Sequence, residues 1–140
     1  MMTPKCLSVA AIALGSLVLA VPSFAHHSFA AEFDANNCAD FTGTLTDIDW
    51  QNPHAYFHMD VKDAAGRVES WTFETVSLST LRRSGTSRQE FLDNVGKAVS
   101  VRGCLARNGE KNLGAASFIT MSDGVKRLVG QDVEGVRGGG

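Results

Sequence analysis

The 140-residue chain lacks several features that would point directly to a function. It contains no Gly-x-Ser-x-Gly motif and no glycine-rich phosphate loop, so a serine hydrolase of the nucleophile-elbow type and a P-loop nucleotide site are both excluded. It also lacks a basic excess, because 13 Lys and Arg stand against 15 Asp and Glu. Nucleic-acid binding depends on cations that neutralise phosphates, so no nucleic-acid partner is expected.

Long apolar runs are nearly absent too, the exception being residues 7–21. This run follows Lys5, is ended by Pro22, and precedes small residues up to Ala25, which is the three-part pattern of a secretory signal. It is too short to cross a bilayer comfortably, which takes about 20 residues. We predict a signal peptide over residues 1–25 and a periplasmic or secreted protein with no membrane span after processing. A retained membrane anchor is the alternative.

Cysteine is scarce, and the positions of the cysteines limit the disulfides that can form. Cys6 falls in the predicted signal, which leaves only Cys38 and Cys104 in the mature chain. Two cysteines in an exported protein predict one disulfide, which would close a loop of about 66 residues and stabilise the fold by roughly 4 kcal/mol. The alternative is a pair of free thiols that bind metal, which the lack of a Cys-x-x-Cys spacing disfavours.

The patterning predicts one small all-β domain with one short helix. Residues 54–61 alternate between apolar and polar side chains, and a capping box of Ser87 and Glu90 opens a helix over residues 86–96. The predicted strands are residues 41–50, 54–61, 68–76 and 97–107, followed by a strand or hairpin over 115–129. This order favours a five-stranded OB-like Greek-key barrel over residues 41–129, with an open antiparallel sheet plus helix as the alternative. Residues 26–40 are expected to form an N-terminal arm and residues 130–140 a disordered tail.

All four histidines lie in two clusters, His26 with His27 and His54 with His58. Cleavage after Ala25 would make His26 the first residue, and a terminal histidine offers its α-amino group and its ring Nδ1 to one metal. A further imidazole completes a three-nitrogen histidine brace, which suits Cu(II) because copper prefers tetragonal nitrogen ligation. His27, by contrast, could make a weaker site with the amine and a backbone amide.

The third ligand is expected to be one histidine of the second cluster. His54 and His58 are four positions apart on a predicted strand and so about 13 Å apart, too far for both to bind one ion. His54, at the edge of the strand, is the more accessible of the two. Glu74 or Asp60 is expected to orient a ligand histidine through its other ring nitrogen. The alternative is that no metal binds, with the terminal pair an accident of cleavage and the other two histidines ordinary surface residues.

The aromatic residues suggest a second kind of site. Trp50, Tyr56 and Trp71 could form an exposed platform for a ligand, as small barrels of this type use. Against this, tryptophans are mostly buried in folded proteins, so both are also candidates for the hydrophobic core.

Three segments, "AHHSFAAEFD", "DIDWQNPHAYFHMDVKD" and "SWTFET", resemble a family of small secreted bacterial proteins of unknown function. Members typically have a terminal His-His-Ser-Phe, a Trp-x-Asn-Pro-His turn and a Trp-x-Phe-Glu strand, and the resemblance covers nearly all of residues 26–129. The motif positions here are His26, His27, Ser28, Phe29, Trp50, Asn52, Pro53, His54, Trp71, Phe73 and Glu74. The resemblance implies no activity, but it favours His54 over His58 as the shared functional histidine.

The sequence therefore predicts a periplasmic copper-binding protein, a carrier or buffer, with candidate ligands His26, His27, His54 and His58. The alternative is a metal-free exported module that uses the aromatic surface to hold a peptide, a saccharide or another exported protein. A copper oxidase or oxygenase is a third reading, and no catalytic residue is predicted for it.

Overall fold

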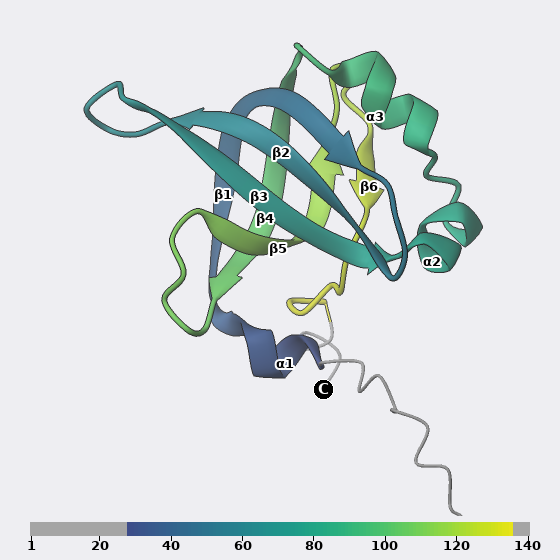
Figure 1. Ribbon diagram of the computed structural model, residues 1–140, viewed down its shortest axis with the longest axis horizontal. Coiled ribbons are helices and arrows are strands. Elements are labelled where there is room, and N and C mark those ends of the chain that lie inside the picture. Colours follow the sequence, from purple (N-terminus) through teal and green to yellow (C-terminus); the bar gives the residue numbers. More distant parts are fainter. Residues whose placement is uncertain (1–27, 136–140) are drawn as a thin grey trace, which may run out of the picture.

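The computed structural model describes residues 28–135, which form one mainly antiparallel sheet with short helices (Figure 1). The elements are α1 (Phe29–Glu32), β1 (Phe33–Asp49), β2 (His54–Lys62), β3 (Val68–Ser77), α2 (Leu78–Arg83), α3 (Arg88–Asn94), β4 (Ala98–Ala106), β5 (Leu113–Thr120) and β6 (Lys126–Leu128). The predicted all-β class is confirmed.

The six strands form one sheet in the order β3-β2-β1-β4-β5-β6. An additional parallel pairing joins β3 to β5, so that the pairings run in a closed circuit from β1 through β2, β3, β5 and β4 back to β1. The described strands number six where the sequence predicted five, and the mainly antiparallel sheet with helices fits the alternative prediction of an antiparallel sheet plus helix. The pairing of β3 with β5 brings together segments that are far apart in the chain.

The β2–β3 hairpin shows why the alternation of residues 54–61 predicts its faces correctly. Ala55, Phe57 and Met59 are buried, whereas the even-numbered positions of β2 from His54 to Asp60 are partly exposed. The turn needs Gly66, whose φ of 79° is a conformation that few other residues adopt. The outward face of β2 is therefore where the polar chemistry of the hairpin lies.

The core is packed closely around one aromatic ring. Phe73 is fully buried and stacks on Phe57, with ring centroids 5.5 Å apart. Gly103 on β4 and Gly114 on β5 lie against the same ring, and a Cβ added to either would lie 2.7 or 2.9 Å from Cε1 of Phe73. These two glycines allow β4 and β5 to approach β3.

The predicted helix is present, but it is not the only one in the described part of the chain. α3 begins with both halves of the capping box, Ser87 and Glu90, as expected. The expectation of a single short helix is wrong, because α1 and α2 are also present. α2 begins at a cap in which Ser77 accepts a hydrogen bond from the backbone N–H of Thr80. Segments of four and six residues are too short to show a helical period in the sequence.

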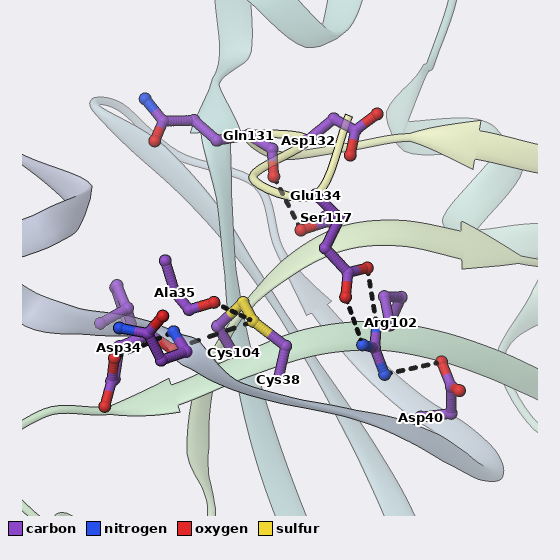
Figure 2. The surroundings of a disulfide bond; sticks show 12 residues. Asp34, Ala35, Cys38, Asp40, Arg102, Cys104, Ser117, Gln131, Asp132 and Glu134 are labelled. Carbon is purple, nitrogen blue, oxygen red and sulfur yellow. Dashed lines mark hydrogen bonds and ion pairs between the residues drawn. A yellow bond between two sulfur atoms is a disulfide. The ribbon is translucent and has the colours of Figure 1, made fainter. Parts of the chain in front are cut away.

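Strand β1 begins at Phe33, eight positions before the strand that the sequence predicts, so the second half of the expected N-terminal arm is part of the sheet. Its first residues pair irregularly with β4, since four residues of β1 between Phe33 and Cys38 oppose one residue of β4. Cys38 and Cys104 are cross-strand partners and form the predicted disulfide (Figure 2).

The segment after β6 continues into residues that the sequence assigned to a disordered tail. The backbone N–H of Val76 donates to Val129, and Val129 in turn donates to the carbonyl of Ser117. Further along, the Ser117 hydroxyl donates to the carbonyl of Gln131 (Figure 2). Glu134 forms an ion pair with Arg102, whose guanidinium also lies beside Asp40 (Figure 2). Val129 therefore joins β3 to β5 just beyond the residues that pair in parallel.

Candidate functional site

The candidate site is built around His54, the first residue of β2, which follows a cis peptide bond between Asn52 and Pro53. Its side chain is 28% exposed, and its Nδ1 lies 2.8 Å from the carbonyl oxygen of Thr75. A carbonyl oxygen can only accept a hydrogen bond, so Nδ1 carries the proton. In the neutral ring, Nε2 is then the nitrogen with a lone pair, which is the form that binds a metal.

This contact depends on an irregularity in the β2–β3 pairing. Tyr56 pairs with Glu74 but His54 pairs with Ser77, so that Thr75 and Val76 together oppose Ala55. Two residues opposite one define a β-bulge, a feature that redirects side chains and is common beside functional sites. The Thr75 hydroxyl donates to the carbonyl of Ala55, which holds the bulge in place.

A carboxylate lies next to the histidine. Oε1 of Glu74 is 3.6 Å from Nδ1 of His54, too long for a hydrogen bond when Nδ1 already donates to Thr75, so Glu74 acts on the ring through its charge. Oε2 of Glu74 accepts a hydrogen bond of 3.2 Å from the Tyr56 hydroxyl. Burial, together with the negative charge of Glu74 and that hydrogen bond, raises the pKa of Tyr56 to about 12. Tyr56 is therefore a neutral donor to Glu74 at physiological pH.

His54 and Glu74 lie in the wall of a pocket of about 300 Å³. The other described residues around it are Ser28, Phe29, Glu32, Phe33, Thr75, Val76, Ala115, Ala116, Gly130 and Gln131. They come from α1, the start of β1, the facing parts of β3 and β5, and the segment after β6. Figure 1 shows α1 and the segment after β6 at the same end of the sheet. Ser28, at the start of the described chain, thus lies at the same pocket as His54.

The other histidine and acid predicted on β2 are placed elsewhere. Nδ1 of His58 lies 2.9 Å from the hydroxyl of Thr72, and Asp60 accepts a hydrogen bond from Ser70. His58 is four positions along β2 from His54, about 13 Å at the rise of a strand. The structure therefore brings Glu74, and not Asp60, to His54.

The three aromatic residues do not share a surface. Tyr56 lies on the outer face of β2 and pairs with Glu74, whereas Trp71 pairs with the buried Met59 and stacks on Phe73. Trp50 also packs against the hydrophobic core, with its ring centroid 6.1 Å from that of Phe91. Tyr56 and Trp71 thus lie on opposite faces of the sheet.

His26 and His27 lie outside the described residues. Among residues 28–135, no three His, Cys, Asp or Glu side chains converge on a point that could hold a metal ion. None of the helices in the described part of the chain has the length and apolar character needed to cross a membrane.

One residue of the site, Thr75, was missed from the sequence. Thr75 acts through its backbone carbonyl. Every residue has a carbonyl, so the residue type does not reveal this contact. Glu32 comes from α1 and also lines the pocket. The hairpin turn could have predicted the position of Glu74. Once Lys62 pairs with Val68, regular antiparallel pairing places Tyr56 opposite Glu74.

The model of a family of unknown function, DUF6152, matches residues 14–115, and the chain belongs to this family. No curated protein matches the chain. No solved structure matches it either.

Proposed function

We propose that this member of the family is a periplasmic copper-binding protein, a carrier or buffer, whose site joins a processed N-terminus to His54. In this proposal, cleavage after Ala25 frees the α-amino group of His26. That amine and the ring Nδ1 of His26 bind one Cu(II), and Nε2 of His54 or the ring of His27 completes a three-nitrogen site.

The observation that carries the proposal is that Ser28 and His54 line one pocket. Two residues of chain span at most about 8 Å between Cα atoms, so an amino terminus freed at His26 would be close enough to Ser28 to reach this pocket.

The state of His54 also favours this role. Ligand histidines commonly donate their other ring N–H to a carbonyl or carboxylate, which fixes the tautomer and raises the basicity of the ligating nitrogen. His54 donates to the carbonyl of Thr75 and has the carboxylate of Glu74 at 3.6 Å. Glu32 adds a second carboxylate to the pocket, so the local charge suits a cation.

Copper is the metal that fits a donor set of one amine and two imidazoles. Cu(II) favours tetragonal nitrogen ligation and leads the divalent affinity order, whereas Mg²⁺ and Ca²⁺ favour oxygen ligands. The disulfide between Cys38 and Cys104 is compatible with the oxidising compartment in which such a site would be loaded.

The test is a copper titration of protein exported and processed in a bacterial host, followed by electron paramagnetic resonance. The processed protein should bind one Cu(II) in a three-nitrogen environment, and a form with one extra residue before His26 should not. His54→Ala should weaken binding by more than the roughly 10- to 100-fold typical of losing an outer partner.

His58→Ala is the matched control, because His58 shares the strand, the face and the partial burial of His54. It should leave copper affinity and the spectrum unchanged. Equal binding by the processed and extended forms would overturn the terminal site. Equal losses in the two histidine variants would overturn the role of His54.

A further inference from the structure

Helix α1 lies in the wall of the His54 pocket, but little within the helix itself holds it in place. The pocket is lined at this side by Ser28, Phe29, Glu32 and Phe33. The helix has only four residues, none of them is buried, and its N-cap makes no side-chain hydrogen bond. A helix this short is not stable alone, so its position depends on contacts with the rest of the chain.

Arg107, the residue after β4, supplies such contacts at the end of α1. The last carbonyls of a helix have no partner within it, and basic side chains commonly bind them. The backbone N–H of Arg107 donates to the carbonyl of Glu32 at 2.8 Å, and its Nε donates to that of Ala30 at 3.1 Å. Its Nη2 lies 3.4 Å from the carbonyl oxygen of Phe33. One residue thus contacts three carbonyls at the end of this helix.

These contacts join α1 to the sheet without being part of the hydrophobic core. Strand β4 pairs with both β1 and β5, so the backbone of Arg107 continues from a fixed strand. Its side chain is 50% exposed, and its ion pair with Asp34 is long, at 3.7 Å. Exposed ion pairs contribute little to the stability of a whole fold. Loss of the Arg107 side chain should therefore loosen α1 while the sheet stays folded.

The position of α1 matters to the proposed copper site because of chain length. A terminus freed at His26 would be two positions from Ser28 but seven from Phe33, the first buried residue of the described chain. The effective concentration of a tethered group falls roughly as the −3/2 power of the tether length. If Phe33 alone anchored the start of the chain, the concentration of the terminal ligands at His54 would fall about fivefold.

We propose that Arg107 is a positioning residue for the His54 site. It holds α1 at the end of β4 and so keeps a terminus freed at His26 within reach of His54. The proposal rests on the proposed copper function. It adds to that function a residue that is neither a ligand nor a neighbour of the ligand histidine.

The test compares Arg107→Ala with the parent, both exported and processed. In the copper-free proteins, the amide of Phe33, which donates to the carbonyl of Phe29 across α1, should exchange about fivefold faster in the variant. The midpoint of urea unfolding should barely change. In copper titrations, the affinity of the variant should be lower by about fivefold.

Two features of the expected loss separate positioning from other effects. Charge alone predicts the opposite sign, because removing a cation close to the pocket reduces its repulsion of Cu(II). In the His54→Ala background, Arg107→Ala should cost little further affinity, because the terminus then has no His54 to reach. A general loss of stability would instead weaken binding equally in both backgrounds.

Arg67→Ala is the matched control. Arg67 is also exposed and also forms an ion pair, with Asp63 in the β2–β3 turn, but no contact joins it to α1 among its hydrogen bonds in the described chain. This variant should change neither the exchange at Phe33 nor the copper affinity.

Unchanged exchange at Phe33 in Arg107→Ala would overturn the inference, because Arg107 would then not hold α1. Unchanged or tighter copper binding, or equal losses with and without His54, would overturn the positioning role. A parent that binds no copper would reject the proposed function and this role together. A parent that binds copper, with no effect of Arg107→Ala, would reject the role alone.

Discussion

Nδ1 of His54 donates a hydrogen bond to the carbonyl oxygen of Thr75, which faces the histidine because the β2–β3 pairing is irregular at this point. The backbone of one strand therefore sets the chemistry of a side chain on the next. This arrangement holds whether or not a metal binds, so it can be examined alone.

The tautomer of His54 is the first prediction. At alkaline pH, where imidazole is neutral, His54 should be protonated at Nδ1, because only that state satisfies the Thr75 carbonyl. Long-range ¹H–¹⁵N NMR spectra distinguish the two tautomers. His58 is the internal comparison, since its partner is a hydroxyl that can donate or accept. A His54 ring protonated at Nε2 would contradict the structure.

The packing of Phe73 gives a second prediction. Gly103→Ala should destabilise the protein by about 1–3 kcal/mol, because the new methyl group would lie 2.7 Å from Cε1 of Phe73. Urea unfolding measures the change. Adding Phe73→Leu should cost less in the Gly103→Ala background than in the parent, since the smaller side chain makes room. Strict additivity of the two changes would show that the glycine is not needed for this contact.

The cap of α3 gives a third prediction. Ser87→Ala should lower the free energy of unfolding by about 1 kcal/mol, because it removes the acceptor for the backbone N–H of Glu90. Gln89→Ala, on the same helix, removes only an exposed contact with Asp93 and should cost less than about 0.5 kcal/mol. Equal effects of the two changes would argue against the capping box.

The disulfide gives a fourth prediction. Replacing Cys38 and Cys104 together by Ala should destabilise the fold by about 2–4 kcal/mol, since the bond closes a loop with a sequence separation of 66. Denaturant unfolding of the parent under reducing conditions should give a similar loss. An unchanged midpoint in both would mean that the start of β1 is held by its other contacts.

The ion pair at the β5–β6 turn gives a pH-dependent prediction. Hydrogen bonds from the Arg127 guanidinium, and next from the backbone N–H of Val125, lower the pKa of Asp123 from 3.8 to about 2. Because the folded value is the lower one, the carboxylate stabilises the fold above pH 4, and this contribution is lost as the pH falls through about 2. Asp123→Asn should therefore be less stable than the parent at pH 7 and equally stable near pH 2. A difference that persists at pH 2 and in 1 M salt would exclude a charge effect.

The parts of the fold that the sequence predicts are those whose signals are local. Alternation gave the faces of β2, the pair Ser87 and Glu90 gave the start of α3, and two remaining cysteines gave one disulfide. The first two features depend on residues that are close together in the chain, and the disulfide follows because only two cysteines remain after the signal peptide. The start of β1 was not predictable in this way, because its polar residues before Cys38 alternate poorly and lie outside the regular pairing of β1 with β4.

The candidate site also contains residues that local sequence signals predict and one that they do not. The choice of His54 followed from its position after the Asn-Pro turn. Glu74 does lie beside His54, but the ring N–H that Glu74 was expected to accept is donated to the carbonyl of Thr75. The part played by Thr75 was not predictable, since it depends on a backbone atom and on a one-residue irregularity that residue types do not encode. The position of α1 against the segment after β6 depends on tertiary contacts between the two ends of the described chain.

The β-bulge at Thr75 and Val76 also determines how this histidine could be transferred to another protein. A designer who copied only β2 would move the imidazole but leave behind the carbonyl that selects its protonated nitrogen. Removing one bulge residue from β3 would restore regular pairing and exchange inward-facing for outward-facing positions along the rest of that strand. The smallest unit that could be transferred is therefore the pair β2 and β3 together with the bulge in their pairing. An insertion or deletion in one strand would have to be matched by a change in the other.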